Sequence, residues 1–263
     1  MRAVLAHFRF GKASGGRKHA LPLIVPLLCI SLALHAAPVE WIQYSILPGT
    51  DFAAQYYVAD TALQGPRVLL IAPHSDEESA GQALDAFISD YKPLRGALVI
   101  CPWPVTPAKR LKSRSYIEDL NRQYAYTEDN NTAIDVIAQY IQSWLLMYKI
   151  DYVLNIHEGY GKFRHNWSAN YGQGIFVDAP ERIPLASAVA RQVNARIANE
   201  NHFLVAQIPM PTTLTWYCQS RGIPAFGIEI QRELRMDRRI LYQKIVLEEF
   251  FRAIGLPIEA QKK

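Results

Sequence analysis

The feature that most constrains the fold is an alternation of short apolar segments with segments of helical periodicity. The apolar segments, rich in β-branched residues, lie at residues 68–72, 97–100, 152–156, 174–177 and 225–230. Helical spacing of apolar residues is found at residues 79–88, 133–147, 185–198 and 239–254. Strands without polar alternation, separated by helices, are typical of a sheet that is buried on both faces. The pattern therefore predicts an α/β fold with a mostly parallel mixed sheet and helices on both faces.

The sequence predicts one domain that follows an N-terminal leader. Half of its 263 residues are hydrophobic and 20% are charged, which excludes a disordered or collagen-like chain. We find no internal repeat, low-complexity tract or linker, so a single domain is expected over residues 38–257. A chain of this length can bury a sizeable core.

Residues 1–36 have the composition of a secretory signal peptide. A basic segment comes first, and an uncharged apolar run follows at residues 20–36. We expect cleavage after Ala36 and export to a bacterial periplasm. An uncleaved anchor is the alternative, although the run is short for a membrane-spanning helix. No later segment is long and apolar enough to span a membrane, so the mature chain is expected to have no span.

The net charge of +4 is not evidence for nucleic-acid binding. Of the 28 Lys and Arg residues, five lie in the leader, which has no Asp or Glu, so the mature chain has 23 basic against 24 acidic residues. Cys101 and Cys218 both lie in apolar surroundings, and we expect two buried free thiols rather than a disulfide. No Cys-x-x-Cys pair is present, which excludes a thiolate zinc site.

Three side chains near the ends of predicted strands are candidate metal ligands. His74 and Glu77 follow the apolar segment 68–72 at a spacing of three, so both can face one point if a tight turn enters a helix there. His157 follows the segment 152–156 and is a plausible third ligand. Imidazole and carboxylate suit zinc, and a catalytic zinc site has three protein ligands. The alternatives are an acidic helix start for Glu77 and a hydrogen-bonded structural histidine for His157.

Two further features lie at the same predicted sheet edge, where open α/β sheets bind ligands. Arg114 and the run Asp119-Leu120-Asn121-Arg122 can form a clamp for a carboxylate, or a surface loop of ion pairs. Glu229 lies within an apolar strand segment, where a carboxylate is costly unless it is paired or functional. Desolvation would tune Glu229 towards a general base.

The order of these motifs resembles the zinc carboxypeptidase superfamily over about residues 66–255. His-x-x-Glu comes first, then Asp-Leu-Asn-Arg, a strand-end His and a strand-borne Glu. The segment RSYIEDLNR also looks like the aspartoacylase-type branch of this superfamily. The segment NIHEGYGKFRHNWSANYGQGIFVD looks most like the exported murein carboxypeptidases that set cell shape in curved and helical bacteria.

The resemblance implies a role for each candidate residue. His74, Glu77 and His157 would hold one zinc ion, and Glu229 would exchange the proton of the attacking water. Arg114 would face the developing oxyanion, and Asn121 and Arg122 would bind the free carboxylate of the substrate. The implied substrate is a peptidoglycan-derived peptide from which the terminal diaminopimelate is removed. A tyrosine that closes over the substrate in some relatives has three candidates, which are Tyr160, Tyr171 and Tyr217.

Three alternatives remain open. The segment VLLIAPHSDEES is similar to the APHPDDE segment of zinc N-acetylglucosamine deacetylases, but no His follows His202 to supply their second motif. An N-acyl amino-acid deacylase of the aspartoacylase type would share the zinc site, although export disfavours it. A non-enzymatic murein-binding protein would keep the pocket without the activity.

Overall fold

The computed structural model describes residues 39–125, 132–164 and 170–261. All of them belong to one compact unit, residues 36–263. The predicted signal peptide, residues 1–36, lies outside the described residues. No helix in the described part of the chain is long and apolar enough to cross a membrane.

The predicted mixed sheet is confirmed, with eight strands in the order β1-β2-β5-β3-β6-β9-β7-β8. Its centre is parallel, because β3 pairs in parallel with both β5 and β6, and β6 pairs in parallel with β9. Antiparallel pairs add β2 beside β5 and β7 beside β9. The strands are β1 (Ile42–Ile46), β2 (Ala54–Asp60), β3 (Arg67–Ile71), β5 (Ala97–Cys101), β6 (Tyr152–Gly159), β7 (Gly174–Val177), β8 (Leu204–Gln207) and β9 (Ala225–Gln231). A separate pair joins β4 (Tyr91–Pro93) to β10 (Ile258–Ala260).

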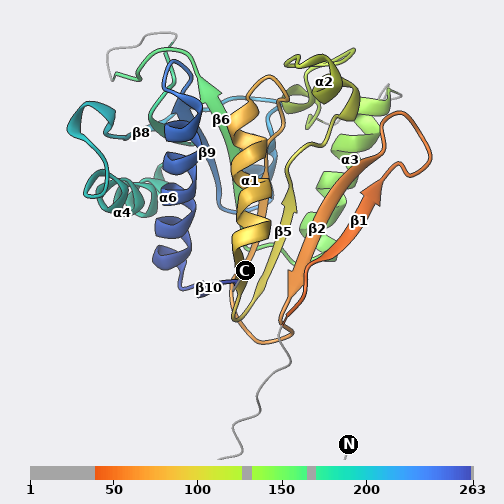
Figure 1. Ribbon diagram of the computed structural model, residues 1–263, viewed down its shortest axis with the longest axis horizontal. Helices are drawn as coiled ribbons and strands as arrows, with labels where there is room; N and C mark the ends of the chain where they lie inside the picture. Colours follow the sequence, from red (N-terminus) through yellow and green to blue (C-terminus); the bar gives the residue numbers. More distant parts are fainter. Residues whose placement is uncertain (1–38, 126–131, 165–169, 262–263) are drawn as a thin grey trace, which may run out of the picture. The chain divides into compact units, whose positions relative to one another are not determined.

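Helices cover both faces of this sheet, as Figure 1 shows. They are α1 (Glu78–Asp90), α2 (Thr106–Leu111), α3 (Ala133–Met147), α4 (Ile183–Asn194), α5 (Leu214–Ser220) and α6 (Met236–Ile254). Alternate residues of the central strands point to opposite faces. Leu70 and its neighbours pack with α1, α4 and α6, whereas Leu69 and its neighbours pack with α3 and α5. The central strands are buried on both faces, which explains why their sequences lack polar alternation.

The boundaries of β6 and α4 differ from the sequence prediction. β6 continues to Gly159, so His157 lies inside the strand rather than just after it. α4 spans residues 183–194 instead of 185–198. Its end is fixed by Asn194, whose side chain makes hydrogen bonds to both the backbone nitrogen and the backbone oxygen of Phe203.

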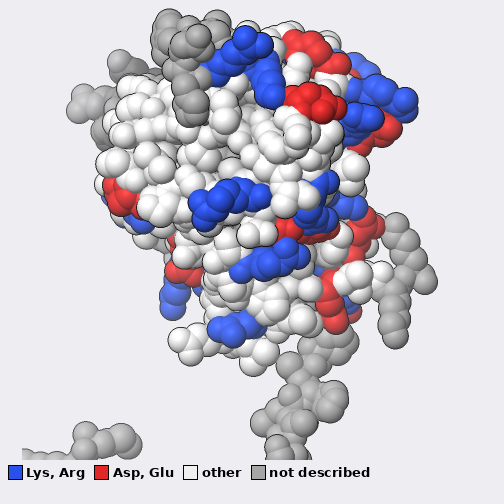
Figure 2. Space-filling model, turned by 90° about the vertical axis from the view of Figure 1, so that its left-hand side faces the viewer, with Lys and Arg blue, Asp and Glu red and all other residues white. Residues whose placement is uncertain are grey.

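Cys101 and Cys218 are buried free thiols, as predicted. Burial raises the pKa of both thiols, which keeps them protonated and unreactive. On the face shown in Figure 2, basic and acidic side chains are interspersed with uncharged ones.

Candidate active site

The predicted ligands His74, Glu77 and His157 converge at the carboxyl ends of β3 and β6, and all three are buried. Glu77 immediately precedes α1, whereas His74 lies in the turn between β3 and that helix. Nδ1 of His74 is 2.9 Å from Oε1 of Glu77, and Nδ1 of His157 is 3.0 Å from Oε2 of the same carboxylate. The two Nδ1 atoms are 3.2 Å apart.

This donor set fits a tetrahedral metal ion. A nitrogen ligand lies about 2.0–2.1 Å from zinc, so two such ligands of a tetrahedral ion are about 3.3 Å apart. The separations between the three residues are close to this value. The carboxylates of Glu77 and Asp119 also favour a positive charge here: burial alone would lower the pKa of His74, but the two carboxylates raise it to about 9. A metal cation bound between the three residues would be stabilised by the same two carboxylates.

Asp119 holds the side chain of His74, one of the three candidate ligands, in place. Its Oδ1 is 2.8 Å from Nε2 of His74, so the ring presents Nδ1 to the other ligands. The same oxygen accepts a hydrogen bond from the backbone N–H of Asn121 and caps the short helix η1 (Leu120–Arg122). Burial would raise the pKa of Asp119, but His74 and Arg114 outweigh it and hold the pKa well below its usual range. Nothing in the sequence pattern separates this role of Asp119 from that of a loop ion pair.

Replacing Asp119 by Asn should weaken metal binding by about 10- to 100-fold, because partners of metal-bound histidines typically contribute that much. Competition with a chromogenic chelator measures the affinity. Asp51→Asn, at an exposed position, is the control and should bind metal like the wild type. Equal affinity of the Asp119 variant and the wild type would show that the Asp119–His74 contact does not support the metal site.

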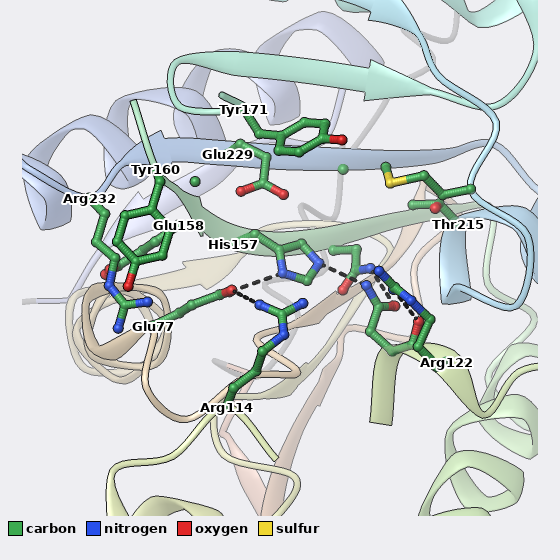
Figure 3. Close-up of a pocket in the computed structure, with 15 residues that line it drawn as sticks. Glu77, Arg114, Arg122, His157, Glu158, Tyr160, Tyr171, Thr215, Glu229 and Arg232 are labelled. Carbon is green, nitrogen blue, oxygen red and sulfur yellow. Dashed lines mark hydrogen bonds and ion pairs between the residues drawn. The ribbon is translucent and has the colours of Figure 1, made fainter. Parts of the chain in front are cut away.

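A cavity of about 270 Å³ opens beside two of the three ligands, Glu77 and His157 (Figure 3). Every predicted catalytic and substrate-binding residue lines it, namely Arg114, Asn121, Arg122 and Glu229. Figure 3 shows Glu229 projecting from β9 beside His157. β6 and β9 are paired in parallel with His157 opposite Glu229, so the strand register itself places the carboxylate next to the ligand.

The electrostatics of Glu229 suit proton transfer. Burial raises its pKa well above the ordinary value, and the nearby negative charge of Glu77 raises it further. Glu77 behaves in the opposite way: burial would raise its pKa, but the two histidines outweigh it and lower the pKa. Two carboxylates whose pKa values are pushed apart can take different roles, and the raised pKa makes Glu229 the one suited to exchange a proton.

The arginines at the cavity have different partners. Nη1 of Arg114 is 3.0 Å from Oε1 of Glu77, and its Nε is 3.2 Å from Oδ2 of Asp119. Arg122 donates from Nη1 to the backbone oxygen of Asn121 at 2.8 Å and has no carboxylate partner among the described residues. Its guanidinium is therefore available to an anionic group in the cavity.

The side chain of Asn121 is held within the protein. Its Nδ2 lies 3.2 Å from Nε2 of His157, and its Oδ1 accepts hydrogen bonds from the side chain of Asn155 and from the backbone N–H of Leu214. Asn121 thus connects the third ligand to β6 and to the start of α5. Its predicted share in binding a substrate carboxylate stays a prediction.

The cavity lining also includes Arg232, which was not predicted, and two of the tyrosines that were left unassigned. Arg232 lines the cavity, pairs with Asp76 at 2.9 Å and lies under the ring of Tyr160. It follows the apolar segment 225–230, so a search of strand ends could have found it. Of the three tyrosine candidates, Tyr160 and Tyr171 line the cavity, whereas Tyr217 packs against the core on the α3 side of the sheet.

A comparison with protein families identifies the family to which the chain belongs. Residues 38–262 match the peptidase M99 family, described as the catalytic part of carboxypeptidases controlling helical cell shape. The chain belongs to this family. The match favours a carboxypeptidase over the deacylase and deacetylase alternatives. A search among curated proteins found no match.

Solved structures show the same fold. The tripeptide-bound cell shape determinant Csd4 from Helicobacter pylori superposes with a TM-score of 0.71 at 20% identity, covering 86% of this chain and 57% of Csd4. A Csd4 structure described as the mDAP-bound form of a D,L-carboxypeptidase gives 0.69 at 22% identity, with 75% and 52% covered. An aspartoacylase family protein from Mesorhizobium loti gives 0.60 at 14% identity, with 89% and 71% covered. The chain thus spans less than two thirds of the length of Csd4.

Proposed function

We propose that the protein is a zinc-dependent carboxypeptidase that removes the C-terminal residue, diaminopimelate, from peptidoglycan peptides in the bacterial periplasm. One observation carries the proposal. Two members of the cluster that fits a metal ion, Glu77 and His157, line one cavity together with a carboxylate of raised pKa and an arginine without a carboxylate partner among the described residues. Membership of the cell-shape carboxypeptidase family supports the reaction class. The Csd4 structures with a tripeptide and with mDAP support the substrate class.

Each residue has a defined task in this proposal. His74, Glu77 and His157 hold one zinc ion, which when bound polarises a carbonyl and lowers the pKa of water. Glu229 accepts the proton of the attacking water and returns it to the leaving amine. Arg114 lies beside Glu77 and stabilises negative charge that develops on the scissile carbonyl oxygen.

Specificity for a chain end comes from Arg122. A planar guanidinium binds a carboxylate through two parallel hydrogen bonds, which an internal peptide group cannot provide. In Figure 3 Arg122 lies at one end of the cavity, with His157 and Glu229 between it and Tyr160. A terminal carboxylate at Arg122 therefore leaves the preceding peptide bond beside the metal cluster. The export that residues 1–36 predict would bring the enzyme to the compartment where such peptides occur.

Arg122→Lys should lower kcat/KM on peptides with a free terminal carboxylate by about 10- to 100-fold, because one charge-assisted hydrogen bond contributes about 1.5–3 kcal/mol. Amidating the substrate should harm the wild type similarly and add little further loss in the variant, since both changes remove one interaction. A two-by-two kinetic cycle of both enzymes with free and amidated tripeptide measures this. Arg110→Lys, on the exposed side of α2, is the matched control. Losses that multiply in a stably folded Arg122 variant would contradict the carboxylate clamp.

A further inference from the structure

Arg232 joins the segments that carry the reacting groups. It follows β9, three residues after Glu229, and its backbone N–H donates to the backbone oxygen of Gly159 at the end of β6, at 2.9 Å. Its side chain reaches Asp76, which lies between two of the candidate metal ligands in the turn that precedes α1. Nη1 donates to Oδ2 of Asp76 at 2.9 Å, and Nη2 donates to the backbone oxygen of the same residue at 2.6 Å. One guanidinium therefore holds both the side chain and the backbone of this turn.

The turn depends on contacts from the strands, because it has no side-chain cap of its own. Glu77 precedes α1 without a capping hydrogen bond, although the first backbone N–H groups of a helix need partners from outside the helix. Glu158 of β6 supplies one such partner, since it accepts a hydrogen bond from the backbone N–H of Ser79 at 2.7 Å. Arg232 supplies the second contact through Asp76. The ends of β6 and β9 thus determine where the turn with the metal ligands lies.

Arg232 is itself fixed, unlike the arginine at the other end of the cavity. Figure 3 shows Arg232 beside Tyr160, at the end opposite Arg122. Its guanidinium carbon lies 5.0 Å from the centre of the Tyr160 ring, and its Nε lies 3.8 Å from Oε2 of Glu158. Among the described residues, Arg232 is the only ion-pair partner of Asp76. The charge of Arg232 is therefore used within the protein, whereas Arg122 has no carboxylate partner among the described residues.

We propose that Arg232 is a positioning residue, which sets the distance between Glu229 and the metal ligands by holding Asp76. The role of Glu229 rests on the proposed function, whereas the effect on the metal ligands does not. Misplacing a reacting group by about 1 Å can cost about 100-fold in rate, so a contact that joins the two segments matters for catalysis without touching the substrate.

The metal ligands are tested first, with cobalt(II) alone as the probe. Cobalt binds to the same nitrogen and oxygen ligands as zinc, and its visible absorption reports their geometry. Arg232→Ala and Asp76→Ala should each weaken cobalt binding by about tenfold, the lower range for residues that orient metal ligands, and should shift the absorption bands. The double variant should bind cobalt like Arg232→Ala, since both changes remove one contact. Competition with a chromogenic chelator measures the affinities.

Arg235→Ala is the matched control, because Arg235 forms an exposed pair with Asp237 at 3.1 Å. It should keep the affinity and the spectrum of the wild type. Losses that multiply in the double variant would overturn the Arg232–Asp76 contact as the cause. Variants that are less stable in thermal unfolding but keep the wild-type cobalt spectrum and affinity would show a purely structural role, and would also overturn the proposal.

The distance to Glu229 is tested by kinetics of Arg232→Lys. Lysine keeps the charge, but one ammonium group cannot reproduce the fixed geometry of two parallel donors. We expect kcat per bound zinc to fall at least about tenfold while KM stays within about twofold, because the contact positions the reacting groups and does not bind the substrate. A raised KM with an unchanged kcat would make Arg232 a substrate-binding residue and overturn the positioning role.

The two levels of the account fail in different ways. A wild type that releases no terminal residue would reject the proposed function, and the cobalt measurements would still decide whether Arg232 positions the metal ligands. A wild type that releases the terminal residue, together with unchanged cobalt binding in Arg232→Ala, would reject only the positioning role.

Discussion

Replacing Glu229 by Gln should lower kcat by at least about 100-fold, the lower range for loss of a general base. Gln is nearly isosteric with Glu but cannot take the proton of a water molecule. Burial and the charge of Glu77 raise the pKa of Glu229, which makes its carboxylate a stronger base than an ordinary exposed one. Metal content and KM should change little, since Glu229 is not one of the three clustered ligands. Steady-state kinetics together with elemental analysis of the same sample measures both effects.

Glu158 is the cavity carboxylate that belongs neither to the metal cluster nor to the proposed proton transfer. One of its oxygens accepts a hydrogen bond from the backbone N–H of Ser79 at 2.7 Å, and the other pairs with Arg239. These bonds hold Glu158 as a structural link between β6, α1 and α6. Wild-type turnover in Glu229→Gln, with a large loss in Glu158→Gln, would assign the base to Glu158 and contradict the role of Glu229.

His74→Ala and His157→Ala should each leave far less than one equivalent of zinc bound after dialysis. Each substitution removes one of the three protein ligands that a catalytic zinc site has, and the remaining two bind the ion far more weakly. Inductively coupled plasma mass spectrometry of the purified variants gives the metal content directly. Peptidase activity should fall with the metal content.

His202→Ala is the control for these two variants, because His202 does not belong to the cluster of candidate metal ligands. It should retain the zinc content of the wild type. Full zinc occupancy in both His74→Ala and His157→Ala would remove the metal site from this cavity.

The sequence was sufficient to predict the elements that carry the ligands. The centres of β3, β6 and β9 are apolar on both faces because helices cover both faces, and such segments are recognisable without knowledge of their neighbours. Parallel strands bring their carboxyl ends to one edge, so His74, His157 and Glu229 could be expected together before their distances were known.

The remaining features depend on contacts between segments that are distant in the chain. β1 and β2 were not predicted, since β1 is largely exposed at the sheet edge and its pairing with β2 decides its structure. The role of Asp119 depends on a contact with His74, 45 residues away. No periodicity or spacing in the sequence encodes these contacts.

The central claim is metal-dependent removal of a terminal residue from a peptidoglycan peptide, and mass spectrometry of digested muropeptides tests it most directly. Purified tripeptide muropeptides are incubated with the enzyme alone, with a chelator, and with a chelator followed by excess zinc. The account predicts a mass loss equal to one diaminopimelate residue in the first sample, no change in the second and recovery of the product in the third. Undigested muropeptides in the zinc-supplemented sample, or release of diaminopimelate that the chelator does not affect, would contradict it.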